Sequence, residues 1–193
     1  IICAWNLIQN ELKKYKTKFV PVDSEHFSLW YALKNSSISD IEKIYLTASG
    51  GPLLKFPKSN SNNISLARAL KHPTWSMGKK ISIDSCTMMN KVFEVIEAKH
   101  LFNLPYDRIS ILTHPNSYIH AIIKFKNGLV KIIAHDTTMK IPIFNTINSD
   151  NNSIFKSDNL NLKKLNNLDL KLVNYNLFPL VNILKYLPKK ISL

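Results

Sequence analysis

Residues Lys80–Ala98 read KISIDSCTMMNKVFEVIEA, and this stretch decides the fold that the sequence predicts. Its first part, Ile81–Asp84, is short and apolar and predicts a strand, whereas Met88–Leu101 follows helical spacing. Four polar side chains lie at and just beyond the junction, namely Ser85, Asn90, Lys91 and Glu94. A hydroxyl, an amide, an ammonium and a carboxylate in one short span can hold both an oxyanion and a cation. We therefore expect a binding site where this strand meets this helix.

The rest of the chain predicts a small mixed sheet packed by helices, which is an α/β fold. The predicted helices are residues 1–14, a helix after Asp23, 65–70, 88–101 and a short one at 180–187. The predicted strands are residues 19–22, 41–48, 81–84, 108–113, 118–125 and 129–134. Lys126-Asn127-Gly128 joins the last two, and Asn-Gly between alternating runs is a strong hairpin signal. Residues 53–63 and 148–167 are polar and predict loops.

Composition narrows the classes of function. The chain has 193 residues, 45% hydrophobic and 20% charged, and contains no apolar run long enough to span a membrane. Its two cysteines predict no disulfide framework and indicate a reducing compartment. The net charge of +13 keeps nucleic acid open as a weaker alternative, although the lysines are scattered rather than striped. The same charge suits an anionic, phosphorylated substrate.

Two carboxylates follow the predicted strand at 19–22. In an extended segment, residues two apart point to one side, so Asp23 and Glu25 can aim at one point. Paired carboxylates suit Mg²⁺ or Mn²⁺, and Glu94 is a candidate third ligand. The alternatives stay open, because Asp23 is also a good helix N-cap and a lone Glu94 is also typical of a solvated helix face.

Two further clusters have both a functional and a structural interpretation. Ser49-Gly50-Gly51 after a strand is suited to contacting a phosphate, but Ser-Gly-Gly-Pro is also an ordinary turn. Trp75 and Met77, beside His72, are placed to close over a ligand or to form a satellite core. His120 lies in a predicted strand, where a satisfied core histidine is the plainer interpretation.

These pieces, in this order, resemble the 1-deoxy-D-xylulose 5-phosphate reductoisomerase family of non-mevalonate isoprenoid biosynthesis. The segments that carry the resemblance are 21–26 (PVDSEH), 46–52 (LTASGGP), 72–80 (HPTWSMGKK), 81–102 and 114–120. The resemblance is dense over residues 20–34, 44–52 and 70–145 and faint over 168–187.

The resemblance implies roles for individual residues. The metal would be bound by Asp23, Glu25 and Glu94, with Ser24 touching the substrate beside it. The substrate phosphate would be held by Ser49, Ser85, Asn90, Lys91 and His72. Trp75 and Met77 would form a flap over the substrate, and Gly78 would lie beside the nicotinamide. His26, His120 and Glu25 are the implied catalytic residues.

The implied reaction is a metal-assisted retro-aldol/aldol isomerisation of 1-deoxy-D-xylulose 5-phosphate, followed by hydride transfer from NADPH to give 2-C-methyl-D-erythritol 4-phosphate. The implied cofactors are Mg²⁺ or Mn²⁺ and NADPH. The implied partners are the sugar phosphate and a second copy of the full-length protein, with no nucleic acid and no membrane. The expected location is the bacterial cytoplasm, with a plastid-type organelle as the alternative.

The chain also departs from the family pattern. It has no Gly-x-Gly-x-x-Gly unit, so we expect a reductoisomerase-type catalytic domain that lacks the Rossmann domain. We expect a catalytic domain over 1–146, an Asn-rich linker over 147–167, and a remnant over 168–193 leading towards a helical domain. Val92 stands where the family has Gly, and His135 to Thr138 diverges. The chain is therefore expected to be a catalytic-domain fragment that is inactive alone, with a degenerate binding module as the alternative.

Overall fold

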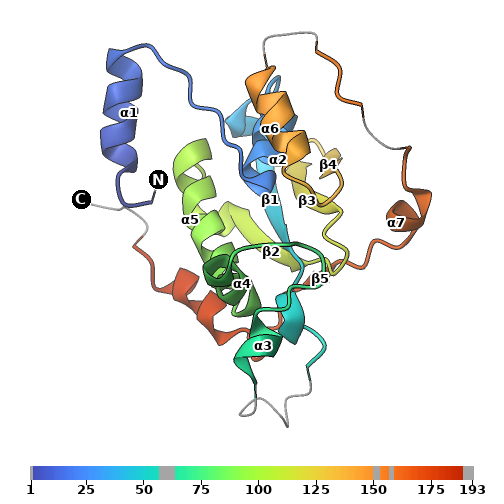
Figure 1. The fold of residues 1–193 in the computed structure, drawn as a ribbon. Coiled ribbons are helices and arrows are strands. Elements are labelled where there is room, and N and C mark those ends of the chain that lie inside the picture. The colour runs from blue at the N-terminus through green and yellow to red at the C-terminus, as the bar shows by residue number, and fades with distance from the viewer. Residues whose placement is uncertain (1, 57–63, 150–152, 157–158, 189–193) are drawn as a thin grey trace.

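A single mixed sheet organises the fold. The computed structural model describes residues 2–56, 64–149, 153–156 and 159–188. Within these ranges five strands pair in the order β4-β3-β1-β2-β5 (Figure 1). Their bounds are β1 Ile41–Ala48, β2 Ile109–Thr113, β3 Ile119–Phe125, β4 Val130–Ala134 and β5 Lys171–Leu172. Strands β1 and β2 are parallel, and every other pairing in this sheet is antiparallel. The predicted mixed α/β fold is confirmed.

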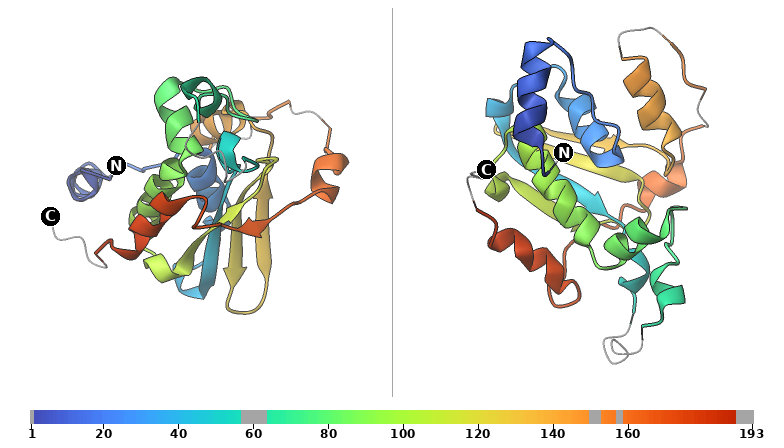
Figure 2. Two further views of the ribbon diagram at one scale, coloured as in Figure 1. Left: turned by 90° about the horizontal axis from the view of Figure 1, so that it is seen from below. Right: turned by 60° about the vertical axis from the view of Figure 1, so that its left-hand side comes forward.

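Helices α2 and α5 pack against this sheet. The α-helices are α1 Trp5–Lys14, α2 Ser24–Leu33, α3 Leu66–Ala69, α4 Lys79–Cys86, α5 Met89–Phe102, α6 Lys140–Ile147 and α7 Leu162–Asn166. The short 3₁₀ helices are η1 Ile38–Asp40, η2 Gly51–Leu53, η4 Tyr106–Arg108 and η5 Pro179–Lys185. Helices α4 and α5 lie on the crossover between the parallel strands β1 and β2. Helix α2 packs on β3, and α5 packs on β1 and β2 beside it (Figure 2).

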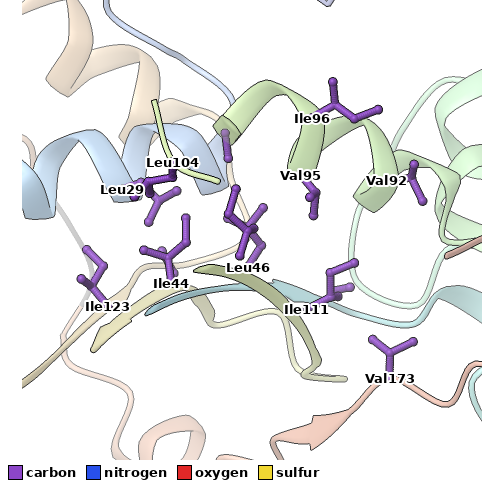
Figure 3. Packing of buried hydrophobic residues seen from close by; sticks show 14 of the residues in the cluster. Leu29, Ile44, Leu46, Val92, Val95, Ile96, Leu104, Ile111, Ile123 and Val173 are labelled. Atoms are coloured by element: carbon purple, nitrogen blue, oxygen red, sulfur yellow. The ribbon is translucent and has the colours of Figure 1, made fainter. Parts of the chain in front are cut away.

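The hydrophobic core lies between the sheet and helices α2 and α5 (Figure 3). Ile44 is central to it, because its backbone pairs with Ile109 on one side and with Ile123 on the other. Val92 and Val95 close the core from α5. This packing fixes the position of α2 and α5, and therefore of the polar side chains at their amino-terminal ends.

Most of the expected elements form where local pattern predicts them. The strand over 41–48 and the hairpin of β3 and β4 around Lys126-Asn127-Gly128 are confirmed, and Gly128 has the positive φ of +86° that such a turn requires. The expected helices at 1–14, 65–70 and 88–101 correspond to α1, α3 and α5 within a few residues. The loop expected over 53–63 falls partly outside the described residues, which end at 56 and resume at 64.

The strand expected at Ile81–Asp84 is wrong, because these residues lie inside helix α4. Two contacts favour the helix over the strand. The Ser82 hydroxyl donates to the Gly78 carbonyl at 2.9 Å, and Lys80 pairs with Asp84 one turn later at 2.6 Å. A turn with Met88 at φ +63° then separates α4 from α5. The deciding stretch is therefore two helices and not a strand followed by a helix.

The strand expected at 19–22 is also wrong, because this extended segment joins no strand of the sheet. Pro21 lacks the N–H that a ladder needs, and its carbonyl accepts instead from the Thr146 hydroxyl at 3.4 Å. Sequence reasoning missed α6, although Pro142 is compatible with the first turn of a helix. It also missed α7 in the Asn-rich segment, and β5.

The described part of the chain contains no helix that is both long enough and apolar enough to cross a membrane.

The Ile44→Ala variant is expected to lower the free energy of unfolding by about 2–5 kcal/mol, since it leaves a cavity between three strands and two helices. Urea unfolding followed by circular dichroism measures this. The matched control is Ile147→Ala, where the side chain is 74% exposed and the expected change is within about 0.5 kcal/mol. Equal losses in the two variants would contradict the central place of Ile44 in the core.

Candidate active site

A cavity of about 210 Å³ opens where β1 ends and β3 begins. Carboxyl ends of parallel strands are common binding positions, since loops and helix termini converge there. The cavity is lined from α2, from the ends of β1 and β3, from the segment that precedes α4, and from the first turns of α5. It has a carboxylate end and a hydroxyl end, which are described in turn.

The carboxylate end is formed by Asp23, Glu25 and Glu94, which each offer an oxygen within 4.8 Å of the others. Asp23 is the N-cap of α2 and accepts from the backbone N–H groups of Glu25 at 3.2 Å and His26 at 3.3 Å. The N-cap interpretation of Asp23 is thus confirmed together with the clustering. The expected extended geometry is wrong, because Glu25 lies in the first turn of α2 and meets Asp23 through helix geometry.

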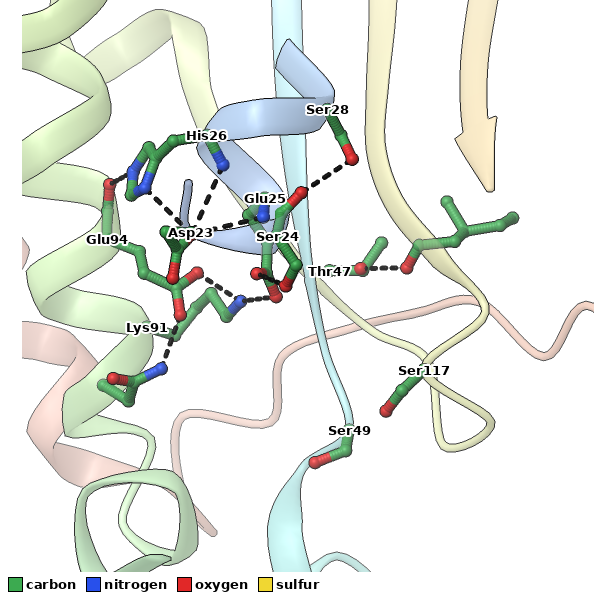
Figure 4. Close-up of polar contacts among 12 residues, drawn as sticks. Asp23, Ser24, Glu25, His26, Ser28, Thr47, Ser49, Lys91, Glu94 and Ser117 are labelled. Atoms are coloured by element: carbon green, nitrogen blue, oxygen red, sulfur yellow. Dashed lines mark hydrogen bonds and ion pairs between the residues drawn. The ribbon is translucent and has the colours of Figure 1, made fainter. Parts of the chain in front are cut away.

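Lys91 bridges two of these carboxylates. Its ammonium group lies 2.7 Å from a Glu25 oxygen and also forms an ion pair with Glu94 (Figure 4). Burial by itself would lower the pKa of Lys91, but the charges of Glu25 and Glu94 outweigh it and raise the pKa above its usual value. Glu94 also accepts from the Asn90 amide at 2.5 Å. Two of the three N–H donors of the Lys91 ammonium group are therefore directed at carboxylates, and one is left for a ligand.

Glu94 is buried among charges of both signs. Burial raises the pKa of its carboxyl well above the usual value, and the nearby charge of Glu25 raises it further, while Lys91 opposes both. A third carboxylate in this position therefore favours any additional cation that reaches the cluster.

His26 is buried behind the carboxylates rather than in the cavity lining. Its Nδ1 lies 2.9 Å from Asp23 and its Nε2 donates to the Glu94 carbonyl at 2.8 Å, so both ring nitrogens face acceptors (Figure 4). Burial would lower the pKa of His26, but the hydrogen bond and charge of Asp23 outweigh it and raise the pKa to about 9. His26 thus joins α2 to α5 as a cation and orients Asp23.

The hydroxyl end is built around Ser49, directly after β1. His72 Nδ1 accepts from the backbone N–H groups of Thr74 at 3.3 Å and Trp75 at 2.9 Å, so the hydrogen of the neutral ring is on Nε2. Burial lowers the pKa of His72, which agrees with a neutral ring. Nε2 then donates to Ser49 Oγ at 2.9 Å, and the Gly51 N–H donates to the same oxygen at 3.0 Å. The Ser49 hydroxyl hydrogen is left to donate to a ligand.

Gly51 allows the turn after Ser49 to pack closely against the end of α4. Its φ is +61°, and a Cβ atom there would lie 3.0 Å from both the Ser85 carbonyl oxygen and the Cys86 Cα. Only glycine allows this turn to lie against the end of α4, where Ser85 lines the cavity opposite Ser49.

The segment of residues 72–78, which we call the strap, borders the cavity. Trp75 and Met77 line it, as does His120 from β3, whereas Gly78 is the helix-capping residue before α4 and does not. His120 is buried, and burial together with the nearby His135 lowers its pKa well below the usual value. Ser24, another predicted substrate contact, also lines the cavity and donates to Glu25 at 2.5 Å.

Several lining residues escaped sequence reasoning. They are Thr47, Ala48, Ser76, Ile81, Met88, Ser117, Ile119 and Met139. Ser117 has a positive φ of +49° and shares a 3.1 Å hydrogen bond with Thr74 of the strap. No local pattern marks it, because its place in the cavity depends on the tertiary contact between β3 and the strap.

Comparison with known proteins adds to this geometry. A family model described as the 1-deoxy-D-xylulose 5-phosphate reductoisomerase C-terminal domain matches residues 19–102. A reductoisomerase of this name from Pelagibacter ubique is 58% identical over all 193 residues, and one from Sulfurihydrogenibium is 48% identical over 143 residues. The chain belongs to the 1-deoxy-D-xylulose 5-phosphate reductoisomerase family. It spans about half of the Pelagibacter relative, 50% of its length, and 37% of the Sulfurihydrogenibium relative.

Solved reductoisomerase structures share the fold. A crystal structure of DOX-P reductoisomerase in complex with NADPH, fosmidomycin and magnesium superimposes with a TM-score of 0.86 at 33% identity, covering 96% of this chain and 48% of that one. The Zymomonas mobilis reductoisomerase in complex with NADPH gives a TM-score of 0.85 at 31% identity over the same shares of the two chains. The fold of this chain is therefore the fold of the matching half of these reductoisomerases.

The Gly51→Ala variant is expected to lose more stability than Gly128→Ala, although both glycines have positive φ. The Gly128 position has open space, so its variant carries only the backbone cost of about 1–2 kcal/mol. Gly51→Ala adds an overpacking cost of about 1–3 kcal/mol. Chemical unfolding measures both, and equal losses would contradict the close packing of the Ser49 turn on α4.

Proposed function

We propose that this chain is the metal- and sugar-phosphate-binding catalytic domain of an NADPH-dependent reductoisomerase that converts 1-deoxy-D-xylulose 5-phosphate to 2-C-methyl-D-erythritol 4-phosphate. The observation that carries the proposal is one cavity with three clustered carboxylates at one end and a prepared hydroxyl donor at the other. A sugar phosphate has complementary ends, namely a polyol that chelates cations and a terminal anion.

The carboxylate end fits a divalent cation. Asp23, Glu25 and Glu94 supply hard oxygen ligands in close proximity, which suit Mg²⁺ or Mn²⁺. When bound there, the cation would serve as a Lewis acid and template for two substrate oxygens during the isomerisation. His26 holds Asp23, and Lys91 and Asn90 hold the glutamates, so the ligand oxygens are positioned before a ligand arrives.

The hydroxyl end supports binding of the substrate phosphate. Ser49 has a free hydroxyl hydrogen, and Ser85 faces the same cavity, with His72 behind Ser49. The net charge of +13 favours an anionic substrate over a neutral one. Because the phosphate does not react, its binding energy is available to orient the substrate and to close the strap.

The remaining assignments are part of the same proposal. Trp75 and Met77 would cover the substrate and exclude water, and Gly78 would lie beside the nicotinamide of NADPH. His120 would act as a catalytic residue from the cavity wall, and His26 by holding Asp23. The domain division at 146 and 167, a homodimer of the full-length protein and a bacterial cytoplasmic location remain proposals, and the bacterial sources of the two relatives agree with the last.

The rival function is a binding module without catalysis. A binding module would have the same cavity but no turnover. The assay that separates the two functions is NADPH oxidation by the complete gene product, measured with 1-deoxy-D-xylulose 5-phosphate and Mg²⁺ or Mn²⁺. Nucleic-acid binding is the weaker rival, and it predicts salt-dependent binding to DNA or RNA that does not depend on Asp23 or Glu94.

The Glu25→Gln variant is expected to lose metal-dependent binding of 1-deoxy-D-xylulose 5-phosphate by tenfold or more, since it removes a charged ligand and a Lys91 partner. Isothermal titration calorimetry with and without Mn²⁺ measures this on the folded protein.

The control is Glu42→Gln, which changes an exposed carboxylate paired with Lys124 at the surface and is expected to leave binding unchanged. Metal-independent binding, or equal binding by Glu25→Gln and the unsubstituted protein, would contradict the proposed metal site.

A further inference from the structure

His120 is held between two other rings. It stacks on His135, with ring centroids 3.7 Å apart and planes inclined by 11°, and it meets Trp75 of the strap edge-on at 6.3 Å. The three rings thus run from the end of β4, across the start of β3, to the strap. His120 and Trp75 line the cavity, whereas His135 lies behind His120 and does not. The His135 ring can therefore affect the cavity wall through its contact with His120.

Hydrogen bonds fix the tautomer of His120. Its Nε2 lies 3.2 Å from the His135 carbonyl oxygen, which can only accept, so the ring hydrogen is on Nε2. Nδ1 then carries the lone pair, and it makes no hydrogen bond with the residues that the structure describes. His120 thus presents a hydrogen-bond acceptor to its surroundings in the cavity wall, and the backbone of residue 135 determines which nitrogen it is.

The His135 ring is itself restrained. Its Nδ1 donates to the Asp136 carbonyl at 2.9 Å, and its edge meets the Phe27 ring of α2 at 6.4 Å. The Asp136 carboxylate pairs with Lys164 of α7 at 2.5 Å. The Nε2 atom of His135 is buried and has no hydrogen-bond partner among the described residues. The ring is thus held by the Asp136 carbonyl, by the edge contact with Phe27 and by the stack on His120.

We propose that His135 is a positioning residue, whose ring stacks on His120 and holds it in the orientation that lines the cavity and supports Trp75 of the strap. The inference rests on the proposed function for its kinetic consequence alone, because the ring geometry stands without it. The role belongs to the ring, since any residue at 135 supplies the carbonyl.

The variants that test this separate the ring from the backbone. His135→Ala removes the ring and keeps the carbonyl, while His135→Phe restores a ring that can stack and removes the unpaired nitrogen. The matched control is His100→Ala in the last turn of α5, which also removes a buried, unpartnered Nε2 but lies outside the cavity lining. Thermal unfolding of all three variants shows which of them are folded under the assay conditions.

Two spectroscopic readouts test the inference without turnover. In a protein that also carries Trp5→Phe and Trp30→Phe, Trp75 is the one remaining source of tryptophan fluorescence. His135→Ala is expected to shift this emission to the red, whereas His135→Phe and His100→Ala are expected to leave it unchanged. Imidazole ¹⁵N shifts are expected to show the Nε2–H tautomer of His120 in every variant, since each keeps the carbonyl of residue 135, and loss of this tautomer in His135→Ala would assign the effect to the backbone rather than to the ring. Unchanged Trp75 emission in folded His135→Ala would overturn the inference.

The kinetic readout uses the complete gene product. Loss of the stacking energy of the ring pair in His135→Ala is expected to raise KM for the sugar phosphate about two- to tenfold, with a smaller effect on kcat. His135→Phe is expected to restore the KM of the unsubstituted protein. Equal kinetics in His135→Ala and the unsubstituted protein would overturn the inference. If the unsubstituted protein itself does not oxidise NADPH, the proposed function fails, and the two spectroscopic readouts still decide the role of His135.

Discussion

The site depends on a buried charge cluster between α2 and α5. Glu25 comes from α2, Glu94 and Lys91 come from α5, and the lysine ammonium bridges the two glutamates. His26 closes the other side by contacting Asp23 and the Glu94 carbonyl. Isolated buried charges are very costly, so each of these groups is acceptable only because its partners are held in place by the core. Moving either helix would separate charges that are stable only together.

The same cluster relates stability to binding. Three carboxylates meet two cationic side chains, so negative charge is in excess. Burial raises the pKa of Glu94, and the nearby charge of Glu25 raises it further. A divalent cation entering the cavity would meet ligands that are already oriented. Lys91 would then be less needed between the glutamates and free to turn towards the hydroxyl end of the cavity.

The hydroxyl end is organised by backbone geometry rather than by charge. The turn at Gly51 places Ser49 against α4, and the N–H groups at the start of the strap fix His72 so that it donates to Ser49. Further along the strap, Trp75 meets His120, which is stacked on His135. The cavity is therefore bordered by a segment with little secondary structure whose position depends on contacts with the start of β3 and the residues just before it.

The sequence by itself determined the features that arise from local pattern. Alternation set the strand over 41–48, Asn127-Gly128 set the hairpin, and the order of motifs identified the family and grouped the residues that line the cavity. The short apolar run at Ile81–Asp84 misled, because four residues cannot report the contacts that Ser82 and Lys80 make with residues one helical turn away. Only the tertiary structure decided the partners of Lys91, the place of Ser117 and the stacking of His135 on His120. These contacts join residues from separate elements, and such pairings arise from the packing of the core rather than from the spacing of residues along the chain.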